Sequence, residues 1–517
     1  MVSLSYQHLR KIQTTRRVIL CISLPYFLVV FHTIMMNFIN KVLCHFESCF
    51  SRKASFGWFV TITLGLMLRS DKLGITSVIR DLALCPGCYG SMIHFFRSSS
   101  WSLENLRLRW FSAVKEYSPL YQEGGFHVLV GDGVKQSKEG RRMPGVKKLF
   151  QESENSAKPE YIHGHMFGGL GILAGNERSW ACIPLSIRLH DGLQAAREWK
   201  DAAVSKPSQM ALASHVIQMV EDAYQAALTF GDSLLLLDRY FLTVPALERL
   251  QSLNSSGDIR MEIVTKAKKS AVAYEKPGPR KSRRGRPPRK GAAVHLKEAF
   301  LSRKEEFQDA EIELYGRKES IRCLCLDLLW GQKLYQQLRF VLVEMNGIQS
   351  ILVSTSLELE PLSVIRLYSY RFRIECTFRE LKQQTGAFCY HFWSKHMPKL
   401  SYYQKKEEAS PLEKVVEEKE HSNILKTVRA IEVHMVLSCA AMGILQSLSI
   451  LMSGEFSPGQ FRYQRTPSKG RVSEAALMAY MRKYFFLFTE KHPELQITQI
   501  IRNQQDTSGT YEDSLAS

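Results

Sequence analysis

The chain has 517 residues, with 69 Lys and Arg against 50 Asp and Glu, a formal net charge of +19 and a pI near 9.4. A chain of this length can bury a large core and is expected to hold more than one domain. The positive charge favours a polyanionic partner, and eleven Cys without regular spacing argue against a disulfide scaffold and for a reducing compartment.

The N-terminal segment needs a separate interpretation. Residues 18–36 are mostly apolar and follow three basic residues, as in a signal peptide or membrane anchor. Pro25 interrupts the stretch, and no small-residue cleavage site is evident. We therefore expect translation to begin at Met35 or Met36, residues 1–34 to be a doubtful extension or a mis-annotated start, and no stable membrane association. A signal or anchor is the alternative.

The next segment predicts helices. Residues 56–110 are typical of a small helical N-terminal domain, which could bind DNA or simply cap the fold. Cys85 and Cys88 form a CPGC pattern with no second pair to complete a zinc site, so we interpret them as turn and packing residues.

A succession of strands and one long helix follows. Residues 126–132 (FHVLVGD) form an apolar run that ends in Asp132, and residues 233–238 (SLLLLD) form another that ends in Asp238. Each predicts a buried strand with a carboxylate at its C-terminal end. Between these runs we expect two more strands, at residues 162–175 and 179–189, and a long helix. That helix is expected to open at Pro207 and end near Gly231, and a further strand is expected at residues 259–267.

The 95 or so residues that follow are too many for a loop. Strand-like runs at residues 320–330, 338–345 and 350–359 predict a β-rich insertion. Trp330 in it is expected to be a core residue, the alternative being a platform on which a flipped base stacks. A charged linker then leads to an apolar helix at residues 424–452 that we expect to pack on the core.

The most informative segment is residues 368–382 (YSYRFRIECTFRELK). Tyr368, Arg371, Glu375 and Lys382 have the spacing Y-x2-R-x3-E-x6-K. On one continuous helix these four side chains would fall within roughly 60° of one another, beside an apolar stripe. A solvated charged helix face is the competing interpretation.

This spacing, with the run RIECTFRELKQ, resembles the signature of the Y-R-E-K group of DDE insertion-sequence transposases, insertion-sequence family four. The runs GDGVKQSKEGRRMPG and LLDRYFLTVPAL look like the first two catalytic motifs of that family. The resemblance implies a catalytic triad of Asp132, Asp238 and Glu375. These carboxylates would hold two divalent metal ions, Mg²⁺ with Mn²⁺ as a substitute. Asp191 is a weaker alternative, and Asp232 is expected to be a turn residue.

The resemblance also implies contacts between Tyr368, Arg371 and Lys382 and phosphates of the transposon end. Lys138 and its basic neighbours either extend that surface or form a solvated loop. Arg284 and Arg286 belong to an RGRP run that resembles an AT-hook; the alternative is a flexible basic linker, and DNA contact is expected in either case.

We therefore expect an α/β protein with a ribonuclease-H-like catalytic core, a β-rich insertion domain and a helical N-terminal domain. It is expected to be the transposase of a bacterial insertion sequence, which cuts at terminal inverted repeats and joins 3′-hydroxyl ends to target DNA. We expect a homodimer on paired ends, in the cytoplasm and nucleoid-associated when bound to DNA. The alternative is a catalytically inactive, transposase-derived DNA-binding protein.

The expected regions are an extension (1–34), the helical domain (35–120), the first part of the core (121–267), the insertion with its basic linker (268–360), the signature helix (361–400), a helical C-terminal region (401–503) and a disordered tail (504–517).

Overall fold

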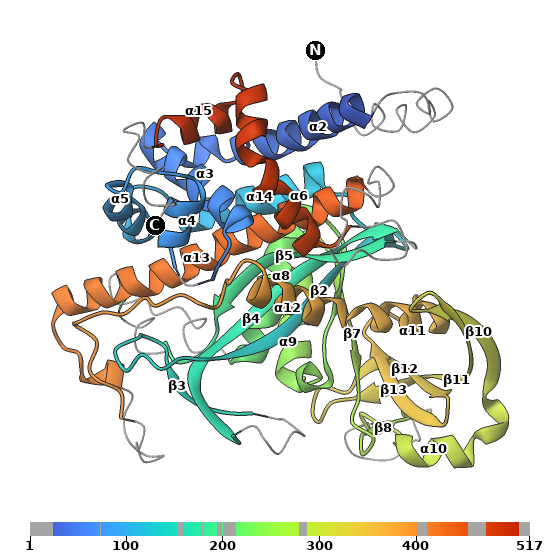
Figure 1. Cartoon of the computed structure of the whole chain (residues 1–517). Coiled ribbons are helices and arrows are strands. Elements are labelled where there is room, and N and C mark those ends of the chain that lie inside the picture. The colour runs from blue at the N-terminus through green and yellow to red at the C-terminus, as the bar shows by residue number, and fades with distance from the viewer. Residues whose placement is uncertain are drawn as a thin grey trace.

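A computed structural model describes residues 24–72, 74–151, 159–176, 179–193, 199, 214–278, 287–401, 411–452 and 472–505. The fold is mixed α/β, as predicted: one large mixed sheet runs through the molecule, and helices cover it (Figure 1). The domain boundaries drawn from the sequence stay predictions.

Five strands form the central part of the sheet, in the order β5-β4-β2-β6-β7. Strand β4 is antiparallel to both of its neighbours, β2 and β5, whereas β2, β6 and β7 run parallel. All five were predicted as strands, because apolar side chains dominate each of them. Their bounds are β2 Phe126–Ser137, β4 Tyr161–Asn176, β5 Ser179–Leu189, β6 Ser233–Leu236 and β7 Met261–Lys266, and the short β1 (Gln122–Glu123) and β3 (Lys147–Phe150) pair with β2 and β4.

The predicted β-rich insertion continues the same sheet. Strand β13 pairs with β7, and the order continues through β12, β11, β8 and β9, with β10 beside β11. Trp330 ends β11 and packs against the hydrophobic cluster of this region, in agreement with a core role. The bounds are β8 Val272–Tyr274, β9 Ala293–His295, α10 Leu296–Ser302, β10 Gln308–Leu314, β11 Arg317–Trp330, β12 Gln336–Met345 and β13 Ile348–Ser354.

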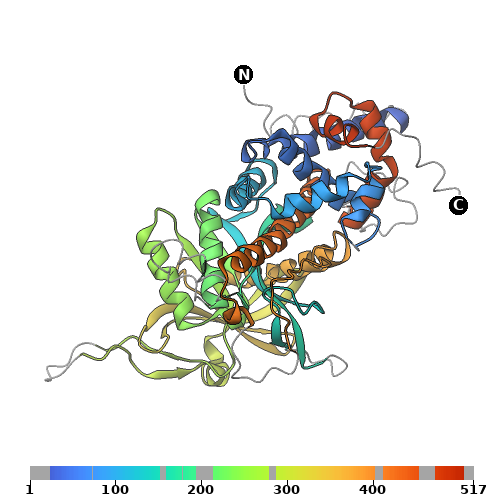
Figure 2. The same ribbon diagram turned by 90° about the vertical axis from the view of Figure 1, so that its left-hand side faces the viewer.

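Helices from both ends of the chain lie side by side over the sheet (Figures 1 and 2). Their apolar faces share one hydrophobic cluster, to which Met35 and Met36 belong. His32, upstream of both, packs on Phe488 with a ring-centroid distance of 4.0 Å. The helices are α2 Leu24–Cys44, α3 Lys53–Leu68, α4 Thr76–Asp81, α5 Cys88–Arg97, α6 Leu103–Tyr117, α14 Glu474–Lys491 and α15 Gln496–Arg502.

Two helices support the central strands from this side. Helix α8 (His215–Phe230) begins with Ser214 as its N-cap, whereas Pro207, where the sequence analysis started the helix, lies outside the described residues. Helix α9 (Val244–Ser256) begins with Thr243 as its N-cap, whose hydroxyl accepts from the amide of Ala246. The CPGC pattern forms the predicted turn, in which the amide of Cys88 donates to the carbonyl of Cys85.

Helix α13 (Glu418–Leu451) is the predicted apolar helix. By length and composition it is the one helix among the described residues that would be long enough to cross a membrane, yet its apolar window is entirely buried inside the protein. It packs mainly on β5 and α3.

The signature segment differs from its prediction. It forms two helices, α11 (Pro361–Tyr370) and α12 (Arg373–Gln383), rather than one. Arg371 and Phe372 keep right-handed helical angles, but the amides at the junction bond to carbonyls three residues back, as from Arg371 to Tyr368 (3.1 Å). Such a tight turn offsets the side chains on its two sides from a straight stripe.

Candidate active site

Two of the predicted acids lie along neighbouring parallel strands. Asp132 lies within β2, which continues to Ser137 and does not end at this acid as predicted, and Asp238 follows the end of β6. Val130 of β2 is in register with Leu236 of β6, and continuing that register by two residues brings Asp132 beside Asp238. Side chains two residues apart on a strand point to the same face. Because Val130 and Leu236 pack in the cluster that holds the apolar residues of α12, both acids belong to the face covered by α12.

Helix α12 reaches this face through a glycine. Gly169 of β4 is paired with Asp132, and a Cβ on Gly169 would lie 2.5 Å from the ring of Phe378. The missing side chain therefore lets α12 approach the sheet beside the acid. The hydroxyl of Thr377 fixes the other flank of the helix by donating to the carbonyl of Cys182 in β5 (2.6 Å).

Arg371 connects the acids of the sheet with the acid of the helix. Its Nη1 donates to Asp132 at 3.1 Å, and its Nη2 forms an ion pair with Glu375 in the first turn of α12. Asp132 also accepts from the amide of Gly133 (2.8 Å). Burial raises the pKa of Asp132, and the guanidinium and this amide offset only part of that effect.

Asp238 and Tyr368 complete the cluster. Burial raises the pKa of Tyr368 to about 12, and the charges of Arg371 and Asp238 also act on this pKa. Asp238 follows β6, and its carbonyl accepts from Thr265 of the next strand (2.9 Å). Asp132, Asp238 and Glu375 all act on the pKa of Arg371, whose net direction is upward despite burial. Asp132 and Glu375 thus pair with one guanidinium, and the charge of Asp238 acts on the pKa of the same group.

These residues fit a divalent cation in chemistry but not in their present arrangement. Carboxylate oxygens are the ligands that Mg²⁺ and Mn²⁺ prefer, and burial leaves the charge of Asp132 incompletely compensated. However, no group of three or more acid, His or Cys side chains within the described ranges is arranged to hold a metal ion. Arg371 occupies the oxygens of Asp132 and Glu375, so metal binding requires it to move away.

Other predicted residues lie apart from the acids. The Nζ of Lys382 lies 5.4 Å from the ring centroid of Phe388. Asp191 pairs with Lys147 (2.6 Å), and Asp232 accepts from the amide of Arg260 (2.8 Å) as a turn residue. Neither acid contacts Arg371. The remaining two predicted DNA-binding residues, Arg284 and Arg286, lie outside the described residues.

Lys138 is not part of a basic surface, which corrects the sequence prediction. It is 8% exposed, and its ammonium donates to the carbonyls of Phe388 (2.6 Å) and Tyr390 (2.9 Å). It also lies 3.6 Å from the ring centroid of Tyr390. Burial lowers the pKa of Lys138 to about 8. The extended strand β2 turns this side chain toward the segment after α12, which the local sequence does not reveal.

The sequence analysis missed the role of Gly169. The signal was present, because glycine recurs unusually often in β4, yet the pattern does not say which glycine faces a helix. It also missed that Arg371 would bind the acids rather than point to solvent. That contact depends on the distance between β2 and α12, which no spacing within one segment encodes.

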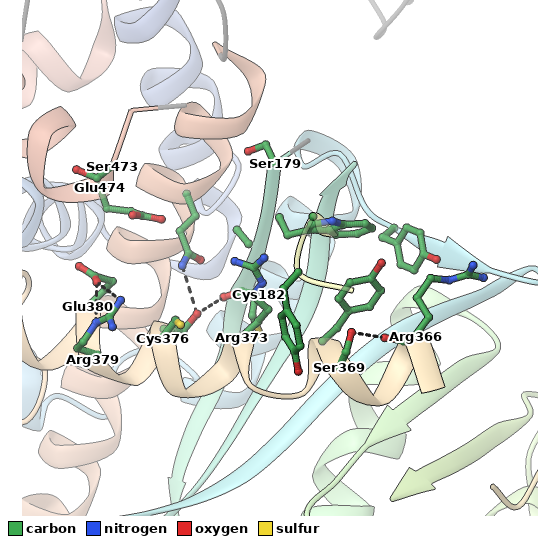
Figure 3. Close-up of a pocket in the computed structure, with 18 of the residues that line it drawn as sticks. Ser179, Cys182, Arg366, Ser369, Arg373, Cys376, Arg379, Glu380, Ser473 and Glu474 are labelled. Atoms are coloured by element: carbon green, nitrogen blue, oxygen red, sulfur yellow. Dashed lines mark hydrogen bonds and ion pairs between the residues drawn. The ribbon is translucent and has the colours of Figure 1, made fainter. Parts of the chain in front are cut away.

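A cavity lies on the other side of the signature helices. Figure 3 shows Arg366, Arg373 and Arg379 spaced along α11 and α12, with Glu474 across the cavity. An aromatic cluster lines one end of it, where the rings of Trp180 and Tyr370 lie 4.7 Å apart. Three glutamates line it together with the three arginines, so its charge is balanced, and Asp132, Asp238 and Glu375 do not line it.

Comparison with family models identifies the chain. Residues 45–314, just over half of the sequence, match the model of the DDE superfamily endonucleases. No curated protein and no solved structure matches it. The chain belongs to the DDE superfamily endonuclease family. This membership supports a nuclease or transposase function with DNA as the substrate, and nucleases of this superfamily generally use divalent metals.

Proposed function

We propose that this DDE superfamily endonuclease is the transposase of a bacterial insertion sequence and belongs to the Y-R-E-K group. It would cut at terminal inverted repeats and join the freed 3′-hydroxyl ends to target DNA. The observation that carries the proposal is that Arg371 pairs with both Asp132 and Glu375, while the register of β2 and β6 brings Asp238 beside Asp132. These acids come from two neighbouring parallel strands and one helix, and each was selected from its own sequence motif.

The strand order supports a ribonuclease-H-like core. Three antiparallel strands, a helix and two further parallel strands give the order β5-β4-β2-β6-β7. One acid lies within the first strand in chain order, and another follows the fourth. The β-rich insertion lies between the second and third acids of the chain.

Asp132, Asp238 and Glu375 would hold the divalent ions. Two such ions, when bound, strengthen an attacking oxygen and stabilise the leaving oxyanion in phosphoryl transfer on DNA. The contribution of the chain is to fix the three carboxylates: the two strands hold Asp132 and Asp238 in register, and Gly169 admits the helix that carries Glu375.

Arg371 and Tyr368 would bind the scissile phosphate. A guanidinium matches phosphate oxygens with two parallel donors, and Arg371 can exchange its carboxylate partners for the phosphate once cations neutralise the acids. Tyr368 keeps its proton at neutral pH, because burial raises the pKa of its hydroxyl to about 12, so it can donate a hydrogen bond. Lys382, Arg284 and Arg286 would add charge along the DNA.

Two features of the proposal rest on the resemblance of the motifs alone. Cut-and-paste transposition requires two ends to be held together, for which we propose a homodimer on paired ends. For a bacterial protein that acts on chromosomal DNA we propose a cytoplasmic location, associated with the nucleoid. Neither has a correlate among the described contacts.

One observation favours a second candidate, a catalytically inactive DNA-binding protein derived from such an enzyme. In the described residues Arg371 already pairs with Asp132 and Glu375, and no metal-holding group is formed. A protein fixed in this state would bind DNA without cutting it.

Cleavage of DNA that carries the gene's own flanking ends separates the two candidates. The full chain and its Glu375→Gln variant are incubated with this fragment in Mg²⁺ or Mn²⁺, and Glu380→Gln serves as the matched control on the same helix. The transposase predicts cleavage by the full chain and by the control, and none by Glu375→Gln. Binding of the ends without cleavage by any of the three would favour the derived protein.

A further inference from the structure

A second cavity, of about 350 Å³, lies where the N-terminal helices meet the segment that follows α12. Its walls come from α3, α5, residues 72 and 74–76, residues 386–393 and α13. Its volume is at the lower end of small-molecule sites, which span roughly 300–1,000 Å³.

The charge of this cavity is one-sided. Arg69, Lys72, Arg97 and His391 line it, and no Asp or Glu does. None of these four forms an ion pair within the part of the chain that the structure describes. The nearest acids are already engaged, because Arg80 pairs with the two carboxylates that act on Arg69, those of Asp71 and Asp81. A cavity with this lining attracts an anion.

Two buried side chains carry polar atoms without partners there. Arg69 is 4% exposed and donates through Nη2 to the carbonyl of Thr385, yet its Nε has no hydrogen-bond partner among the described residues. His434 is 7% exposed, and its Nε2 likewise has none in the described chain. Burial and the charges of Arg69 and Lys138 lower the pKa of His434 to about 3, so its ring is neutral. Buried polar atoms left unsatisfied are costly and call for an explanation.

Aromatic side chains supply the rest of the lining. Tyr89 and Trp393 are 48% and 56% exposed, which is high for such large rings. Inside, Phe392 packs against Phe96 and Tyr390, with ring centroids 5.3 and 5.9 Å apart. Exposed rings beside cations are the usual surface for an unpaired base and its phosphate, since every base has a face that stacks.

The cavity is joined to the candidate active site through the chain. Gly386, three residues after the end of α12, has a φ of +56°, and a Cβ there would lie 2.3 Å from Nη2 of Arg69. Only glycine fits this approach. The segment that leaves the helix of Glu375 therefore leads directly into the cavity.

We propose that this cavity binds one unpaired nucleotide of a DNA strand, with the base stacked on Trp393 and Tyr89 and the phosphate on Lys72 and Arg97. This inference rests on the proposed function for the origin of the strand, since cutting and rejoining ends exposes unpaired nucleotides next to the acids. The chemistry recognised is a nucleotide, and a free mononucleotide would present the same groups.

Binding of a fluorescein-labelled hexathymidylate to the full chain tests the inference, by fluorescence anisotropy in EDTA at a series of salt concentrations. Trp393→Ala removes the stacking ring, and Lys72→Ala removes an exposed cation. We expect Trp393→Ala to bind about tenfold more weakly. We expect Lys72→Ala to lower the slope of log affinity against log salt by about 0.7. Phe486→Ala and Lys483→Ala, on α14, are the matched controls and should bind as the unmodified chain does.

Equal affinity of Trp393→Ala and Phe486→Ala would overturn the inference, and so would tighter binding of thymidine monophosphate than of the hexanucleotide, measured by competition. Thermal melts of each variant exclude unfolding as the cause, since Lys72 and Trp393 are exposed. The assay needs neither metal nor cleavage. Loss of cleavage in the experiment on Glu375 therefore leaves this result readable, and a failure here leaves the proposed transposase intact.

Discussion

Two sites at opposite ends of α12 hold charge in opposite ways. At its N-terminal end Asp132 and Glu375 pair with Arg371, and the charge of Asp238 acts on the pKa of that guanidinium. Beyond its C-terminal end the cavity around Arg69 is lined by cations and by no acid. At the first site burial raises the pKa of Asp132 despite its pairing with Arg371. At the second site the cations that line the cavity have no acid partner among the described residues.

Each of the two sites lacks the charge that a ligand would supply. A partly buried charge without a partner is unfavourable. Such charges are therefore found where a ligand of the opposite charge binds. The acid cluster calls for cations, and the Arg69 cavity calls for an anion. A DNA substrate with bound metal ions supplies both, and the 11 residues of α12 link the two places.

The largest effect is expected at the acid cluster. Asp132→Asn and Asp238→Asn should each lower metal-dependent strand cleavage by about 10³-fold, since a metal ion stabilises the transition state by several kcal/mol. Asp191→Asn is the control, because Asp191 pairs with Lys147 and lies outside the cluster. The measurement is the single-turnover cleavage rate of a DNA fragment with the flanking ends. A loss in Asp191→Asn equal to that in Asp132→Asn would contradict the assignment of the triad.

Lys138, which lies against Tyr390 of the Arg69 cavity, should affect the pH dependence of stability. Burial lowers the pKa of Lys138 from its usual 10.5 to about 8. Between these values the unfolded chain binds the proton and the folded protein does not, so this group makes stability rise with pH across that window, by up to about 3 kcal/mol. Urea unfolding at pH 7.5 and pH 10 measures it. The rise should shrink in Lys138→Met, and an unchanged rise would refute the buried position of the ammonium.

The distance between the sheet and α12 can be changed at Gly169. A methyl group in Gly169→Ala would meet the ring of Phe378, and overpacking of this kind costs about 1–3 kcal/mol. Chemical denaturation should report that loss, and cleavage should fall further than the stability alone explains. Adding Phe378→Leu should recover part of the stability. If Gly169→Ala is as stable as the unmodified chain, the close approach of α12 is not tight.

A smaller effect separates the two roles of Arg371. Without DNA it competes with cations for Asp132 and Glu375, so Arg371→Gln should bind Mn²⁺ about tenfold more tightly, the size of one charge-assisted hydrogen bond. Calorimetric titration with Mn²⁺ measures this. With DNA the same variant should cut more slowly, because it lacks a phosphate contact. Weaker Mn²⁺ binding by Arg371→Gln would exclude the competition.

Much of the central fold follows from the sequence. The runs that end in Asp132 and Asp238 are mostly apolar, as buried parallel strands are. The apolar helix at residues 424–452 is continuous and lacks Gly or Pro except Gly443. These local signals were sufficient. The interruption at Arg371 and Phe372 was not predictable from propensity, since both residues are acceptable in a helix and the tight turn comes from packing.

The residues of the candidate site could be predicted from the sequence, but the contacts that they make with one another could not. The three acids could be selected because each follows a recognisable run, whereas the pairing of Arg371 with Asp132 spans 239 residues. Lys138 shows the same limit: a lysine in a polar run is expected to be solvated, and only the chain after α12 buries it. Five parts of the chain line the Arg69 cavity, and no local sequence pattern indicates that they meet.

The central claim is that Asp132, Asp238 and Glu375 take up divalent cations when DNA is bound. The most direct test is electron paramagnetic resonance while Mn²⁺ is titrated into the complex with the flanking-end fragment. Bound Mn²⁺ no longer contributes to the signal of free Mn²⁺, so the loss of that signal measures binding. The account predicts saturable binding to the unmodified chain and to Asp191→Asn, and at least tenfold weaker binding to Asp132→Asn and to Glu375→Gln. Equal binding by all four proteins would contradict it.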